Sequence, residues 1–175
     1  MRALVVFESM FGNSELVARA VGEGLVRGGC SEVEVTRVDR APTEVPDGVD
    51  LVLVGGPTHA FGMTRQSSRD EAVRQGAPES GTGRGIREWV DLVHAAPSVR
   101  FATFDTRMDK VRRLPGSAAH QASRHLRRRG FRLASGPTSY YVSSATGPLG
   151  ADETAKAQRW GEAVARNLAA TGAVR

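Results

Sequence analysis

Apolar residues recur along this chain in two alternating patterns: short continuous runs and stripes with helical spacing. The run at residues 3–7 contains β-branched members and precedes a stripe of 3.6-residue period over 16–25, which ends at Gly28-Gly29. The most apolar run, 49–54, stops at Gly55-Gly56-Pro57. Together these patterns predict strands at 3–7, 33–38, 49–54, 99–104 and within 131–142, and helices at 16–25, 86–94, 117–128 and from 152 onward.

Strands of this kind, apolar on both faces and separated by helices, predict a parallel sheet joined by right-handed crossovers. A chain of 175 residues fits a single domain, residues 1–175. We therefore expect an α/β fold of three layers, doubly wound around a five-stranded parallel sheet. Ligands of such sheets bind beyond the carboxyl ends of the strands, which directs attention to loops 8–14, 55–66 and 105–117.

One connection is longer than usual. Residues 66–85 are polar and rich in Gly, Ser and Arg. We expect a short helix at 69–75 and a mobile remainder.

The composition, 40% hydrophobic and 25% charged, excludes a disordered or fibrous chain. No apolar run approaches the roughly 20 residues of a membrane span, and the N-terminal run lacks the flanks of a signal peptide. A single cysteine, Cys30, forms neither an internal disulfide nor a zinc site. These features predict a cytoplasmic protein with no membrane span and no metal.

The charge is unevenly distributed along the chain. Its formal value is +5 and the pI is near 10.3. Residues 100–132 hold ten Arg or Lys against Asp105 and Asp109, a net charge of +8, so the rest of the chain sums to −3. Nucleic acid is an unlikely partner because no Phe, Tyr or Trp interleaves with the basic run at 107–129. We expect an acidic protein partner instead.

The first candidate loop follows strand 3–7 and leads directly into a helix. Ser9, Asn13 and Ser14 supply hydroxyl and amide groups, and Gly12 allows close approach of the backbone. A phosphate is held in this way by N–H groups at a helix N-terminus. Because the loop contains no Lys or Arg, it favours a monophosphate over a nucleoside triphosphate. The alternative is a simple strand-to-helix turn with an Asn N-cap.

The second candidate loop, residues 55–63, ends the most apolar strand. Its glycines let the backbone lie against a flat ring, and Thr58, His59 and Phe61 can donate, cover or stack. The alternative is a turn with Phe61 buried in the core. A histidine such as His59 is more often a surface or capping residue than a proton donor.

The motif Ser-x-x-Gly-Asn-Ser at residues 9–14 is similar to the phosphate loop of flavodoxins. The motif Gly-x-Pro-Thr at 55–58 resembles the flavin loop of flavodoxins and of flavodoxin-like quinone reductases. Met10-Phe11 looks like the variant in the flavodoxin modules of flavodiiron proteins. The resemblance implies a flavodoxin-like fold with strand order 2-1-3-4-5 and bound FMN. The cofactor-binding residues that it implies are Ser9, Met10, Phe11, Gly12, Asn13, Ser14, Pro57, Thr58, His59, Ala60, Phe61, Gly62, Asp105, Thr106 and Arg107.

The third loop, residues 104–110, matches flavodoxins poorly. They commonly place a Tyr there against the flavin ring, whereas this chain has no Phe, Tyr or Trp from 105 to 130. Met108 or Arg107 would cover the ring in its place, or that face stays open. We assign no catalytic residue in this chain.

The resemblance implies an electron-transfer protein that carries one or two electrons between redox partners. Two alternatives remain: an FMN-dependent oxidoreductase of the quinone reductase or protoporphyrinogen oxidase type, and a flavin-free binding module that uses the basic stretch.

Overall fold

The computed structural model describes residues 1–78 and 83–172 and centres on a largely parallel sheet. Strands β1 (Arg2–Phe7), β2 (Glu32–Arg37), β3 (Val49–His59) and β5 (Arg100–Met108) pair in the order β2-β1-β3-β5. The fifth strand comes in two pieces, β6 (Arg132–Leu133) and β7 (Thr138–Val142), which both pair in parallel with β5. The expected order 2-1-3-4-5 is therefore confirmed, with an interruption in the last strand.

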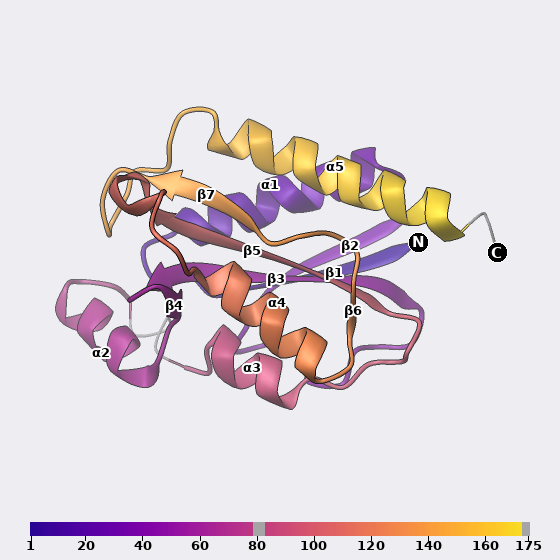
Figure 1. Cartoon of the computed structure of the whole chain (residues 1–175), viewed down its shortest axis with the longest axis horizontal. Helices are drawn as coiled ribbons and strands as arrows, with labels where there is room; N and C mark the ends of the chain where they lie inside the picture. The colour runs from indigo at the N-terminus through magenta and orange to yellow at the C-terminus, as the bar shows by residue number, and fades with distance from the viewer. Residues whose placement is uncertain (79–82, 173–175) are drawn as a thin grey trace.

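Helices cover both faces of the sheet (Figure 1). Helices α1 (Asn13–Arg27) and α5 (Glu153–Gly172) lie on one face, and α3 (Ile86–Leu92) and α4 (Ala118–Arg128) lie on the other. Side chains of β1 alternate between the two faces of the sheet and so contribute to two cores. Val5 and Phe7 belong to the core beneath α1 and α5, and Leu4 and Val6 belong to the core beneath α3 and α4. The strand is apolar throughout because both of its faces are covered, which confirms the predicted three layers.

Two strands extend further than their apolar runs. β3 continues to His59 because its end pairs with the two-residue strand β4 (Gly62–Met63), and β5 continues to Met108 because residues 104–108 pair with β7. The segments expected to be loops from 55 and from 105 thus begin as strand. A short 3-10 turn, η2 (Asp109–Val111), follows β5.

The long polar connection contains helix α2 (Gln66–Arg74), which begins three residues before the helix predicted at 69–75. Figure 1 shows α2 at the end of the sheet where the strands β3 and β7 finish. Residues 79–82 of the remainder that was expected to be mobile lie outside the described residues. No helix within residues 1–78 and 83–172 is both long and apolar enough to cross a membrane.

Candidate functional site

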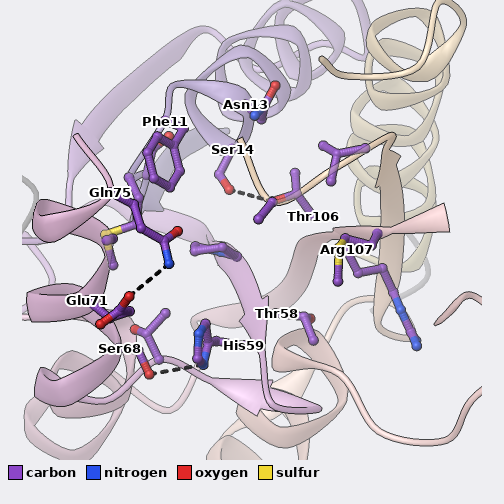
Figure 2. Close-up of a pocket in the computed structure, with 18 of the residues that line it drawn as sticks. Phe11, Asn13, Ser14, Thr58, His59, Ser68, Glu71, Gln75, Thr106 and Arg107 are labelled. Carbon is purple, nitrogen blue, oxygen red and sulfur yellow. Dashed lines mark hydrogen bonds between the residues drawn. The ribbon is translucent and has the colours of Figure 1, made fainter. Parts of the chain in front are cut away.

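A cavity of about 270 Å³ lies at the carboxyl ends of β1, β3 and β5 (Figure 2). This volume is close to the lower limit, about 300 Å³, of small-molecule pockets. The chain leaves β1 toward one edge of the sheet and β3 toward the other, so the cavity occupies the topological switch point where such sheets bind ligands. Its lining comprises Ser9, Met10, Phe11, Asn13, Ser14, Pro57, Thr58, His59, Ala60, Thr64, Ser68, Glu71, Ala72, Gln75, Thr106, Arg107, Met108, Val142 and Ala145.

One side of the cavity is built from hydroxyl groups and the N-terminus of α1. Ser14 Oγ and Thr106 Oγ1 lie 2.7 Å apart and share a hydrogen bond, and both side chains are buried. Ser9 Oγ accepts a hydrogen bond from the N–H of Gly12 at 3.1 Å. The first N–H groups of any helix have no partner within it and carry a partial positive charge. This side of the cavity therefore suits an anion held without a basic side chain.

Gly12 makes the sharp turn into α1. It is the N-cap residue, with φ of 89° and no side-chain cap, and a Cβ there would meet nothing within 4 Å. The alternative interpretation, an Asn N-cap, is wrong. Asn13 is the first residue of the helix, and its side-chain amide donates to the carbonyl of Thr146 at 3.2 Å. The left-handed backbone of Gly12 turns the loop so that the amides of the first turn face outward.

The second loop forms the β3–β4 hairpin, whose two turn residues, Ala60 and Phe61, have φ of 46° and 63°. His59 and Ala60 line the cavity, whereas Phe61 is 52% exposed and lies outside the lining, as does the buried Gly62. The alternative of a core Phe61 is therefore wrong. Thr58 anchors the hairpin, because its Oγ1 accepts a hydrogen bond from Ala118 N at 2.8 Å.

The third segment, Asp105 to Arg107, belongs to β5, so its side chains alternate between faces. Thr106 lines the cavity, but the carboxylate of Asp105 is fully buried beneath α4, where Oδ2 accepts from Ala119 N at 2.8 Å. Asp105 is thus a helix-capping residue outside the lining. Arg107 lines the cavity only with its stem: Nη2 donates to the carbonyls of Val111 and Leu114, and the guanidinium points away (Figure 2).

Sequence reasoning missed the wall formed by α2. Ser68 and Glu71 of this helix, and its C-cap residue Gln75, face the cavity opposite Thr106 (Figure 2). Ser68 Oγ lies 3.1 Å from His59 Nδ1 and shares a hydrogen bond with it, and the Gln75 amide donates to Glu71 at 2.9 Å. Hydrogen bonds from Arg74 and Gln75 lower the pKa of Glu71. A helix was predicted here, but nothing in its local pattern indicates that it packs beside the loop at residues 9–14.

The basic stretch at 100–132 does not form one surface. Arg100 and Arg132 lie opposite each other on the neighbouring strands β5 and β6, at the amino end of β5. Helix α4 runs back toward that end, so Arg124, Arg127 and Arg128 lie away from the cavity. The exposed cations that follow the carboxyl end of β5 are Lys110, Arg112 and Arg113. Arg112 pairs with Asp109 at 3.3 Å and lies over the ring of Tyr141. Of the exposed cations in this stretch, only these three lie on the cavity side of the sheet.

Within the described part of the chain, no three His, Cys, Asp or Glu side chains gather closely enough to hold a metal ion.

The strand order, the two helical layers and the cavity at the switch point define a flavodoxin-like fold. Solved structures bear this out. The chain is similar to a flavodoxin from the domain Archaea (16% identity, TM-score 0.62, 97% of this chain and 99% of that one). It is also similar to flavodoxin 1 from Bacillus cereus (15%, 0.64, 94% and 97%). A third similar structure is the flavodiiron protein from Giardia intestinalis (16%, 0.59, 97% of this chain and 36% of that one).

No protein-family model matches the sequence, and no curated protein matches it. The likeness at these identities establishes the fold, and what the cavity holds has to be argued from its own residues.

Proposed function

We propose that this protein binds FMN in the cavity and carries one or two electrons between redox partners. The observation that carries the proposal is the cradle of hydroxyl groups and helix amides at the switch point. Ser9, Ser14 and Thr106 contribute uncharged donors, and the N-terminus of the 15-residue helix α1 adds its dipole. This donor set fits a terminal monophosphate, because it lacks the lysine with which a nucleoside triphosphate site commonly holds its phosphates.

The remaining lining fits a flat ring less completely. Among the lining residues Phe11 is the one Phe, Tyr or Trp, and Met108 of β5 and Val142 of β7 add apolar surface. Phosphate contacts would supply about 1.5–3 kcal/mol for each charge-assisted hydrogen bond, and the helix end up to about 2 kcal/mol. Nanomolar binding needs about 12 kcal/mol, so we expect FMN affinity in the micromolar range.

Bound FMN would supply one- and two-electron chemistry, while the protein supplies binding, orientation and control of solvent access. In this chain Ser9, Ser14 and Thr106 would bind the phosphate, and the backbone at Pro57–Ala60 would lie along the ring edge. His59 is oriented by its hydrogen bond to Ser68 and faces the same cavity. The group of Lys110, Arg112 and Arg113 favours an acidic protein as the electron donor or acceptor.

A second candidate function is an FMN-dependent oxidoreductase of the quinone reductase or protoporphyrinogen oxidase type. One observation favours it: Met108, on the cavity side where flavodoxins commonly have a Tyr, is 39% exposed and leaves that face accessible to a small substrate. Turnover of a quinone with NAD(P)H separates this enzyme from a carrier. A cytoplasmic location remains a prediction for either function.

The proposal is tested by titrating the flavin-free protein into FMN and into riboflavin and following flavin fluorescence. We expect FMN to bind more tightly by about a hundredfold, because riboflavin lacks the phosphate and its hydrogen bonds. Equal affinity for the two flavins would show that no phosphate is held at α1. Absence of binding to both would favour the flavin-free module.

A further inference from the structure

Arg69 of helix α2 is buried at 2% exposure, although an arginine is rarely buried unless it is paired. Its guanidinium donates to Glu88 at 3.0 and 3.3 Å and to Gln66 Oε1 at 2.9 Å. On the other side it lies 4.0 Å from the carboxylate of Glu8. One cation therefore lies between two carboxylates that are 80 residues apart in the sequence.

Glu8 is the residue immediately before the phosphate loop, and its side chain is 2% exposed. Its carboxylate accepts hydrogen bonds from Thr64 Oγ1 at 2.5 Å and from Ile86 N at 2.9 Å. Burial raises the pKa of Glu8 against the opposing effects of these bonds and of Arg69. The cluster of Glu8, Arg69 and Glu88 thus joins the end of β1, helix α2 and the start of α3.

Apart from this cluster and the hydrogen bond between Ser68 and His59, helix α2 has few contacts that hold it in place. Its buried residues are Arg69 and Ala72, and the apolar cluster on its cavity side consists of Met10, Ala72 and Ala77 with Phe11 packed against them. A helix of nine residues is not stable by itself in water, so its position depends on these tertiary contacts. The same helix and its C-cap residue present Ser68, Glu71 and Gln75 to the cavity.

We propose that Arg69 is a positioning residue for the ligand cavity: by bridging Glu8 and Glu88 it fixes α2 as the wall opposite Thr106. The part of this proposal that concerns ligand affinity rests on the FMN-binding function proposed above. Arg69 does not line the cavity, so it would not contact a ligand bound there. It acts through the helix that carries the lining residues.

The test compares Arg69→Met with Arg69→Lys and with Arg65→Met, a matched control because Arg65 is exposed and lies just before the same helix. Amide hydrogen exchange is measured on the flavin-free proteins. In Arg69→Met we expect exchange across residues 65–77 at least ten times faster than in the wild type, with α1 and α5 unchanged. Arg65→Met should exchange as the wild type does, and Arg69→Lys should recover part of the protection.

Arg69→Met leaves the buried carboxylate of Glu8 and the partly exposed carboxylate of Glu88 without their cation, and it risks loss of folding. Glu88→Ala is the second variant: Glu88 is 38% exposed, and its removal leaves Arg69 facing Glu8. We expect faster exchange confined to residues 65–77 in this variant also. Unchanged exchange across 65–77 in the folded variants would overturn the proposal.

The affinity part is read from FMN titrations of the same proteins. We expect at least tenfold weaker binding in Arg69→Met and Glu88→Ala, chiefly through faster dissociation, and wild-type binding in Arg65→Met. A loosened α2 with unchanged FMN affinity would refute the link to the cavity. If the wild type binds no FMN, the proposed function fails, while the exchange comparison still decides whether Arg69 positions α2.

Discussion

Gly12 and Gly130 provide a matched pair of substitutions that separates backbone strain from ligand binding. Both residues have φ of 89°, and in both a Cβ would meet nothing within 4 Å. They differ in position: Gly12 lies at the turn from the loop at 9–14 into α1, and Gly130 follows the end of α4 at the other end of the sheet. Alanine should therefore strain the backbone equally at both positions, but only Gly12→Ala should disturb the cavity.

The expected loss of stability follows from the left-handed conformation. A residue with a Cβ costs roughly 1–2 kcal/mol there relative to glycine. For a domain of this size each 1 kcal/mol lowers the midpoint of thermal unfolding by about 2–4 °C. We expect the same decrease in Gly12→Ala and Gly130→Ala, because neither methyl group meets a neighbouring atom.

Ligand affinity should distinguish the two variants. In Gly12→Ala the strained turn displaces the first amides of α1, which removes about one charge-assisted hydrogen bond of roughly 1.5–3 kcal/mol. This corresponds to FMN binding weakened by about ten- to hundredfold, with riboflavin binding unchanged. Gly130→Ala should bind both flavins as the wild type does.

Thermal unfolding and fluorescence titration of the two variants provide the measurement. Equal FMN affinity in Gly12→Ala and Gly130→Ala would refute the placement of the phosphate at α1. A parallel loss of riboflavin affinity in Gly12→Ala would mean that the loop contacts the ring or the ribityl chain.

Three further predictions concern other parts of the molecule. Phe61→Gly should raise the free energy of unfolding by about 1 kcal/mol, seen in urea denaturation, because it relieves a left-handed φ of 63° and removes an exposed ring; FMN affinity should not change. Burial raises the pKa of Glu8 above 4.5, so the folded state retains a proton that the unfolded chain releases, and stability falls as pH rises from about 4.5 through that raised pKa. Glu8→Gln should show a smaller fall over this range in urea denaturation, and an equal fall would assign it to other groups. Electron transfer with an acidic redox protein should slow as salt rises and slow again in an Arg112→Glu, Arg113→Glu double variant, and rates indifferent to both would leave these cations without a role in docking.

The helices and strands, and the position of the loop at 9–14 at the end of β1, could be predicted from the sequence because their determinants are local. Apolar runs and 3.6-residue stripes depend on neighbours within one element, and Ser9, Gly12 and Ser14 stand within six residues of one another. The structure brings eleven of the fifteen predicted cofactor residues to the cavity lining; Gly12, Phe61, Gly62 and Asp105 are the others.

The tertiary structure decided what depends on distant partners. β5 continues past its apolar run because β7 pairs with it, and this extension sends Asp105 beneath α4 while Thr106 faces the cavity. The direction of α4 separated cations that are neighbours in the sequence.

Arg69 shows the same limit most clearly. In the sequence it is one of many arginines in a polar connection, and a local pattern cannot distinguish a buried arginine from an exposed one. Its burial requires two carboxylates, Glu8 before it and Glu88 after it, which only the completed fold brings to either side of its guanidinium.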